Sequence, residues 1–496
     1  MNYDIKKDNF KTSNILSKGV RSSHISVEAA VMGVERRGRQ NMNLDTGTRT
    51  SHSRRLEEDE VMEQGEQLSF MPDRWSRIGF RAKDTSSLFN NIHFHINEDS
   101  LNEAFNALDG TKALGVDGVS KSEYGKNLQA NLKELTKRVQ NGSFRPRPKK
   151  EVLIPKANGK TRPIAISCFE DKLVDWVVSK VLTTIYEPCF IRNSFGYRPN
   201  KSADGAIKAC YYSLCKNQRK HALEIDFSNF FNMIPHGKLM KVLSKKITDT
   251  RFKRLIGRFL TGGIQIDEGE SLPSEIGTPQ GSIMSPILAN IYLNEVIDQW
   301  FLENYGNYNN IIVRYADDAV FFFKDKDDCH SFREALYKRV QTYGLELNKE
   351  KTKVLDLSKG GNEVLTFLGL TIYWGKQGSR KILKVKTSKE KLIKSIREFE
   401  VWIKKVRNQK KLKDIWRLVQ MKLKGHINYF GYQGNQLKLN HFQFAVQKLL
   451  FKWLNRRSQR RSYNWEGFKE RLKNLPLMGN LKDLKLKQLG RNWYVH

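Results

Sequence analysis

The sequence predicts an α+β body followed by a basic helical domain, and three patterns carry this prediction. Apolar residues at helical spacing from Leu101 to Leu108 indicate a helix early in the body. In residues 311–323, two runs of β-branched and aromatic residues flank a short turn, which is typical of two paired strands. In residues 391–407, apolar side chains recur every three or four positions and basic residues occupy the other face of the expected helix.

The chain has 496 residues, which is long enough for roughly two to four domains. Its composition changes along the sequence and divides it into four segments. Residues 1–79 lack apolar periodicity and are rich in Ser, Arg, Asn and Glu, which predicts a flexible basic extension. Residues 80–375 mix helix and strand signals and form the expected body. Residues 376–477 form the basic helical domain, and residues 478–496 a short basic tail.

The basic domain should contain two further helices, at about 412–429 and 438–457, on either side of the turn signals Gly431 and Gly434. No repeat with a period of 20 to 50 residues is evident in the chain, so a solenoid is not expected.

The charge of the chain points to a polyanionic partner. Lysine and arginine number 87 against 53 acids, a formal charge of +34, and the last 121 residues hold 32 of these bases and only seven acids. A solvated surface that keeps the protein soluble is the simpler explanation of one short basic run. Because the excess is large and aromatic residues are interleaved with it, nucleic-acid binding is favoured. The densest group of bases is Arg456, Arg457, Arg460 and Arg461.

The sequence is expected to be that of a soluble, cytoplasmic protein. No apolar run approaches the roughly 18 residues that a membrane helix requires, and the first ten residues lack the apolar core of a secretory signal. The five cysteines contain no C-x-x-C pair, so neither a disulfide framework nor a zinc knuckle is supported.

Asp317 and Asp318 stand at the tip of the expected hairpin IIVRYADDAVFFF. Adjacent aspartates are commonly just turn formers. Here the flanking strands are apolar, and two carboxylates held together at such a tip repel each other unless a cation neutralises them. Oxygen ligands of this kind suit Mg²⁺.

Asp226 is a second candidate ligand, because the apolar strand before it delivers it ahead of the bulky Phe227, Phe230 and Phe231. A strand-end cap is the structural alternative. Phosphoryl transfer by two metal ions requires carboxylates from separate elements that converge on one point, and Asp226 and Asp317 are suited to that arrangement.

Two further motifs fit a nucleotide substrate. Residues 277–281, GTPQG, form a turn that exposes backbone ahead of a helix of small and apolar residues. Upstream, LIPKANGKTRPIAI indicates a basic β-hairpin with Lys156 and Arg162 on either side of an Asn-Gly turn, which could close over a triphosphate. Taken alone, this would be an ordinary surface hairpin.

In order, seven sequence blocks resemble those of reverse transcriptases, most closely the proteins encoded by bacterial group II introns. They are LIPKANGKTRPIAI, SFGYRPNKSADGAI, EIDFSNFFNMI, GTPQGSIMSPILANIYL, RYADDAVFF, YGLELNKEKTKV and FLGLTIYW. The later segments LKGHINYFGYQGN and WLNRRSQRRSYNWEGF resemble the thumb or maturase region of that family. The resemblance runs from about Asn97 to about Leu477.

The resemblance implies a right-hand polymerase, with fingers and palm followed by an α-helical thumb. It implies that the protein copies RNA into DNA, binds group II intron RNA, assists its splicing and takes part in intron mobility. Implied partners are intron RNA, an RNA template with a DNA primer, deoxynucleoside triphosphates and target DNA. The implied site residues are Asp226, Asp317 and Asp318 for two Mg²⁺ ions, Lys156 and Arg162 for the triphosphate, Gln280 and Gly281 for the nucleotide pocket, and Phe231 for the sugar.

Two departures from the family pattern stand out. Asn232 occupies the position where the family usually has an aspartate after the aromatic pair, but that side chain is not a metal ligand, so activity is expected. No Cys-pair or H-N-H pattern follows Leu477, so no endonuclease domain is expected. A domesticated reverse transcriptase of a retron, a diversity-generating element or a defence system is the alternative enzyme, and an RNA-binding splicing factor with an inactive palm is the alternative of another class.

Overall fold

The computed structural model describes residues 73–155, 161–215, 219–265, 271–272, 276–306, 310–358, 362–457, 464–477 and 486–489. They belong to one compact unit of the chain, Pro72–His496. Helices and strands are mixed up to Thr387 and long helices follow from Lys389, so the predicted α+β body with a helical domain after it is confirmed. None of the helices in this part of the chain combines the length and the apolar composition that a bilayer crossing requires.

The first part of the body is helical and packs around the long helix α7, which buries Leu173, Val177 and Val181 on its inner face. Helix α3 crosses the boundary expected at residue 79, and the domain boundaries remain a prediction. The elements are α3 (Arg74–Ala82), η1 (Ile92–His95), α4 (Glu98–Ala107), α5 (Lys121–Tyr124), η2 (Gly125–Asn127), α6 (Leu128–Gln140), α7 (Phe169–Tyr186) and η3 (Glu187–Cys189).

A small sheet with the strand order β2-β1-β4-β5 adjoins these helices. Strands β1 and β2 pair antiparallel from Lys150↔Ile166 to Pro155↔Thr161, which confirms the predicted hairpin. Its turn, including Lys156, lies outside the described residues. The strands are β1 (Lys149–Pro155), β2 (Thr161–Ile166), β4 (Ile264–Gln265) and β5 (Ser271–Leu272).

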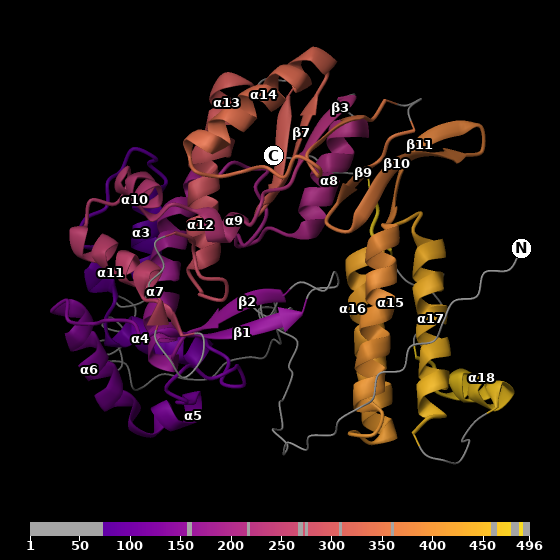
Figure 1. Cartoon of the computed structure of the whole chain (residues 1–496), viewed down its shortest axis with the longest axis horizontal. Coiled ribbons are helices and arrows are strands. Elements are labelled where there is room, and N and C mark those ends of the chain that lie inside the picture. Colours follow the sequence, from indigo (N-terminus) through magenta and orange to yellow (C-terminus); the bar gives the residue numbers. More distant parts are fainter. Residues whose placement is uncertain are drawn as a thin grey trace, which may run out of the picture. The chain divides into compact units, whose positions relative to one another are not determined.

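A second, fully antiparallel sheet has the order β6-β7-β3-β8 and lies between two helices (Figure 1). Successive side chains of β7 point to opposite faces. Phe321 and Phe323 contact Phe332 of α14, whereas Val320 and Phe322 join a buried cluster with residues of α8. The elements are α8 (Ala203–Cys215), β3 (His221–Ile225), β6 (Ile311–Tyr315), β7 (Asp318–Phe323), α14 (Lys326–Thr342) and β8 (Lys353–Asp356).

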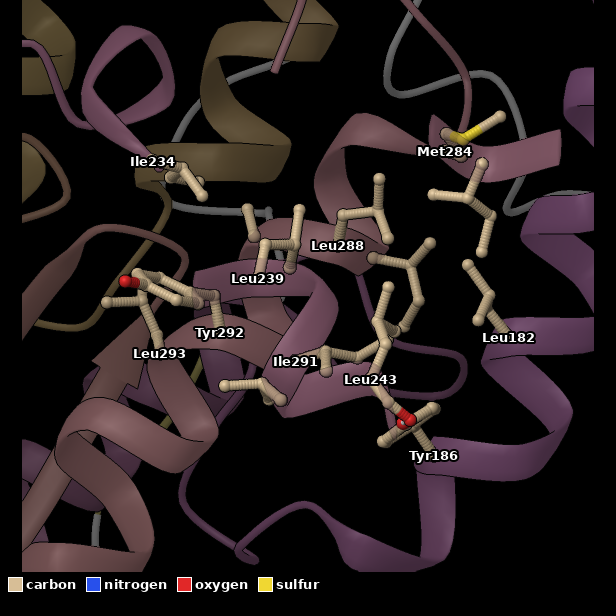
Figure 2. Close-up of a cluster of buried hydrophobic side chains, with 14 of the residues drawn as sticks. Leu182, Tyr186, Ile234, Leu239, Leu243, Met284, Leu288, Ile291, Tyr292 and Leu293 are labelled. Carbon is tan, nitrogen blue, oxygen red and sulfur yellow. Dashed lines mark hydrogen bonds between the residues drawn. The ribbon is translucent and has the colours of Figure 1, made fainter. Parts of the chain in front are cut away.

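Helix α12 (Ser285–Leu293) runs through the core of the body, where an all-round apolar helix is stable. Figure 2 shows its residues Leu288 and Ile291 among Leu182 of α7 and Leu243 of α10 (His236–Ser244). A π-helical turn, η4 (Asn294–Gln299), and α13 (Trp300–Asn304) continue it. Because α12 is fixed on all sides, the loop that precedes it is anchored at its end.

The chain then enters a three-stranded sheet and a helical domain whose longest helices run side by side (Figure 1). Asn435 joins the two parts, because its side chain bonds to the backbone and hydroxyl of Thr387 and to the carbonyl of Phe430. The elements are β9 (Leu365–Phe367), β10 (Leu370–Gln377), β11 (Arg380–Thr387), α15 (Lys389–Val406), α16 (Leu412–Phe430), α17 (Gln436–Leu454) and α18 (Trp465–Asn474).

Candidate active site

Three aspartates meet at one end of the β6-β7-β3-β8 sheet. Asp226 directly follows β3, and the last pair of the β3–β7 ladder is Ile225↔Ala319, so Asp226 lies beside Asp318 at the start of β7. Tyr315 pairs with Asp318 and closes a two-residue turn of Ala316 and Asp317. The predicted strand, turn and strand are therefore present, and pairing with β3 brings the two predicted sites together.

The carboxyl groups of this site are short of positive charge. Burial, and then the neighbouring Asp317 and Asp226, raises the pKa of Asp318 to about 7. Burial and then Asp226 also raises the pKa of Asp317, and burial followed by Asp318 raises that of Glu224 on β3 to about 7. In the described part of the chain, no three His, Cys, Asp or Glu side chains are close enough together to hold a metal ion as they stand.

A lysine that the sequence reading did not single out supplies a cation to this site. The Lys351 Nζ lies 2.9 Å from Asp226 Oδ2, although both side chains keep access to solvent. The turn that carries Lys351 is fixed to the site, because the backbone N–H of Asn348 donates to the carbonyl of Asp226 at 2.7 Å. Lys351 belongs to the block YGLELNKEKTKV, but nothing in its spacing indicates the contact.

The turn that bears Asp317 is supported from beneath by a buried ion pair. Arg314 and Asp298 are both fully buried, and Arg314 donates three hydrogen bonds of 2.5–3.1 Å to the two oxygens of Asp298. The same guanidinium donates to the carbonyl of Ala316 at 2.9 Å. Ala316 has φ 57°, a left-handed conformation that costs energy for a residue with a Cβ. The hydrogen bond from Arg314 therefore supports the turn in this conformation.

Gly196, in the block SFGYRPNKSADGAI, lets its loop come close to the turn of Ala316 and Asp317. A Cβ at Gly196 would lie 2.3 Å from the backbone nitrogen of Ala316, so only glycine fits there. Its neighbour Tyr197 lies close enough to Asp317 and Arg162 for their charges to act on its hydroxyl, and burial is the main cause of the raised pKa of Tyr197.

The hairpin β1–β2 and the GTPQG turn meet beside the aspartates. The N–H of Ala165 in β2 donates to the carbonyl of Gln280 at 2.7 Å. Gly281 has φ 115°, and a Cβ there would lie 2.5 Å from the Ala165 carbonyl oxygen, so a larger residue would push the strand away. Arg162 of the same strand is close enough to Asp317 to oppose the rise in its pKa.

Phe231 lies in α9 (Phe230–Met233), next to the same turn. Its carbonyl accepts a hydrogen bond of 2.6 Å from the N–H of Thr278. Its ring is only partly buried and packs edge-on against the buried Phe230, with the centroids 5.3 Å apart. Part of the Phe231 ring therefore packs on the core, and part of it remains accessible to a ligand.

A buried carboxylate that the sequence reading missed anchors the end of this loop. Asp175 of α7 is completely buried and accepts hydrogen bonds from Ser282 Oγ at 2.7 Å and from the N–H groups of Ile283 and Met284 at 2.8 and 2.9 Å. Lys149 of β1, itself buried, is its cationic neighbour. An aspartate in the middle of an apolar helix gives no pattern that would have revealed this role.

Two residues of the basic cluster expected to bind nucleic acid, Arg456 and Arg457, follow directly after α17. Arg456 is exposed and stacks over the Trp453 ring, 5.4 Å from its centroid, and Arg457 donates to the Lys410 carbonyl at 3.0 Å. Arg460 and Arg461 lie outside the described residues.

The chain is similar in sequence to reverse transcriptases and to proteins encoded by group II introns. A family model described as "Reverse transcriptase (RNA-dependent DNA polymerase)" matches residues 154–372. Protein YkfC of Escherichia coli is 31% identical over 291 residues, which cover 51% of this chain and 74% of that protein. Group II intron-encoded protein LtrA of Lactococcus lactis is 27% identical over 431 residues, 69% of this chain and 70% of that protein. Among solved structures, telomerase from Candida albicans in complex with a telomeric RNA fragment aligns with a TM-score of 0.39 and 15% identity, over 70% of this chain and 67% of that one.

Proposed function

Because the chain belongs to the reverse transcriptase family, in the branch that includes group II intron-encoded proteins, we propose that it copies group II intron RNA into DNA and assists splicing of that RNA. The observation that carries the proposal is the meeting of Asp226 with Asp317 and Asp318 at one end of a sheet, next to the loop that holds Gln280 and Gly281. The division into fingers and palm (80–375) and thumb (376–477) is part of the same proposal.

The donor set at this site suits divalent cations. Its groups are carboxylate oxygens, the ligands that Mg²⁺ prefers. Burial, and then the neighbouring carboxylates, raises the pKa of Asp317 and Asp318, so a cation bound there would favour their ionised forms. An ammonium group already contacts Asp226. We therefore assign Asp226 and Asp317, with Asp318 beside them, to two Mg²⁺ ions. Such ions would stabilise the negative charge on the attacking and leaving oxygens.

The remaining residues bind and orient the nucleotide in this proposal. Arg162, with Lys156 of the same hairpin, would pair with the triphosphate, since guanidinium groups bind phosphate through two donors at once. The exposed backbone at Gln280 and Gly281 would line the pocket. Phe231 would lie against the sugar and exclude a 2′-hydroxyl.

The thumb would supply the intron-specific part of the activity. Residues 376–496, which include the thumb, carry 32 bases and seven acids, a net charge of +25 out of the +34 of the whole chain. The apolar residues of the thumb helices pack into their shared core, so the exposed bases of this region are the groups that would meet an external partner. Template RNA, a DNA primer and target DNA would be attracted by the same positive charge, because it acts on any phosphate backbone.

Primer extension tests the proposal directly. The purified chain, given an RNA template, an annealed DNA primer, deoxynucleoside triphosphates and Mg²⁺, is expected to extend the primer, and chelation of the metal should stop it. The same protein should accelerate splicing of a group II intron from its own gene at a magnesium concentration where the RNA alone reacts slowly. Active extension without effect on splicing would remove the splicing role and favour a domesticated reverse transcriptase. Failure of the extension reaction would overturn the polymerase assignment.

A further inference from the structure

A pocket of about 350 Å³ opens between α6, the loop that follows it, η1 and α11 (Thr250–Thr261). Helices α6 and α11 lie well away from strands β3 and β7, which carry the aspartates (Figure 1). The residues that line the pocket are shared with none of the groups assigned above, so it is a separate feature of the molecule.

Arginines of one helix face dominate the wall. Arg251, Arg254 and Arg258 follow one another at steps of three and four along α11, which places them on one side of the helix. No acidic residue lines the pocket. Desolvation, and then the nearby Arg145 and Arg254, lowers the pKa of Arg258.

The polar groups nearest these arginines are mostly carbonyl oxygens. Arg145 and Arg258 donate to the same two carbonyls, of Gly142 and Phe144, at 2.9–3.0 Å. The carboxylate of Asp249, just before α11, is already used, because its oxygens contact the His93 ring at 2.8 Å and accept from the N–H groups of His93 and Phe252. A carbonyl carries only a partial charge, so an excess of positive charge remains.

A buried histidine is aimed at the same space. His93 is 6% exposed, and Asp249 fixes its Nδ1 side, so its Nε2 faces Arg251 at 3.5 Å. Gln140 also lines the pocket, and its Nε2 donates to the carbonyls of Ile96 at 2.9 Å and of His93 at 3.5 Å. Val139 and Leu255 supply apolar wall between these polar groups.

We propose that this pocket binds one nucleotide of an RNA strand, with its phosphate on Arg251, Arg254 and Arg258 and its base against Val139 and Leu255. Arginine forks match the oxygens of a phosphate, and the volume falls within the range of about 300–1,000 Å³ that small-ligand sites occupy. The inference rests on the proposed function, because it requires that the chain binds RNA. It adds a second RNA-binding site, away from the aspartates of the candidate active site.

The salt dependence of RNA binding tests the site. Labelled single-stranded RNA is titrated with the full chain at several salt concentrations, using wild type, Arg254→Ala and Arg258→Ala. A control on the same helix is Lys253→Ala, which removes the same charge from a residue outside the pocket whose Nζ donates to Ser244 Oγ at 3.0 Å. Each pocket variant should weaken binding about threefold to tenfold and reduce the log-log salt slope by about one, and the control should leave the slope unchanged.

Two outcomes would overturn the proposal. Equal losses in the pocket variants and in Lys253→Ala would mean that the arginines act only through the overall field. Binding of free adenosine monophosphate that Arg254→Ala abolishes, with RNA affinity unchanged, would make the pocket a mononucleotide site. Melting curves exclude unfolding as the cause of any loss. Primer extension by the wild-type preparation is recorded alongside, so that a failed pocket with active polymerisation is distinguished from a failed polymerase assignment.

Discussion

Phe231 offers a prediction about a single side chain. Its carbonyl accepts a hydrogen bond from Thr278 and its ring is only partly buried. In the proposed function this ring lies against the sugar of the incoming nucleotide. Phe231→Ala should raise the incorporation of ribonucleotides relative to deoxyribonucleotides, because the space of a 2′-hydroxyl is opened. Single-nucleotide extension kinetics with both substrates measure this ratio. Unchanged discrimination in an active variant would show that Phe231 is simply a packing residue.

The buried carboxyl group of Asp171 should make the free energy of unfolding depend on pH. This buried carboxyl accepts a hydrogen bond from the Arg147 N–H at 3.0 Å, and burial raises its pKa from 3.8 to about 7. Between these values the unfolded chain is ionised and the folded chain keeps the proton. The group therefore makes the fold less stable as pH rises, by about 1.4 kcal/mol per unit, until both states are ionised.

The variant Asp171→Asn should lack this slope and should be the more stable protein above about pH 7. Denaturant unfolding of both proteins across this range is the measurement. Asp328→Asn, at an exposed aspartate of α14, is the matched control and should follow wild type. Parallel stability curves for wild type and Asp171→Asn would contradict the assignment.

At the level of residues, the sequence predicted groups with a local signature and missed those defined by distant contacts. Asp226 and Asp317 stand at the ends of apolar strands, and the pairing of those strands brings them together. Lys351 reaches Asp226 across 125 positions of sequence, and Asp175 bonds to a loop more than 100 residues away. No periodicity or spacing encodes such a contact, since it exists only once the fold has formed.

Variants of the buried ion pair Arg314–Asp298 test whether this pair supports the hairpin that carries Asp317. Arg314→Met alone should lower stability by about 3–5 kcal/mol, because Asp298 would remain buried and unpaired. Arg314→Met with Asp298→Leu removes both charges and should recover most of that stability. DNA synthesis by the double variant should nevertheless remain slower than that of wild type. The Ala316 carbonyl has lost its hydrogen-bond donor, so the turn that carries Asp317 is less firmly held.

Unfolding curves and steady-state kinetics of the single and double variants separate these effects. We expect the double variant to show a lower kcat with a KM for deoxynucleotide close to that of wild type. Wild-type kcat in the stable double variant would mean that the buried pair serves stability alone.

Elements with a strong period were predicted well. The helix expected at 391–407 is found at Lys389–Val406, and those expected at 412–429 and 438–457 at Leu412–Phe430 and Gln436–Leu454. The π-helical turn at Asn294–Gln299 was not predicted, because its sequence, NEVIDQ, continues the helix before it and carries no signal for a change of hydrogen-bond spacing. That turn places Asp298 against Arg314, so its effect on the site is direct.

For the whole molecule, the concentration of charge in the thumb predicts how it binds RNA. Reversal of Arg456, Arg457, Arg460 and Arg461 should weaken intron RNA binding and splicing assistance and lower the log-log salt slope by several units, since each phosphate contact releases counterion. Reversal of four exposed lysines of the body, Lys241, Lys324, Lys326 and Lys338, changes the net charge equally. If both quadruple variants lost the same affinity, the thumb cluster would have no special part in binding.

The most direct test of the central claim compares DNA synthesis and RNA binding in one preparation of Asp317→Ala. Loss of this carboxylate should cost several kcal/mol of transition-state stabilisation, about a thousandfold or more in the rate of primer extension. The basic thumb is untouched, so the dissociation constant for intron RNA should stay within about twofold of wild type. Primer extension near the wild-type rate in Mg²⁺ by the folded Asp317→Ala protein would contradict the assignment of this site.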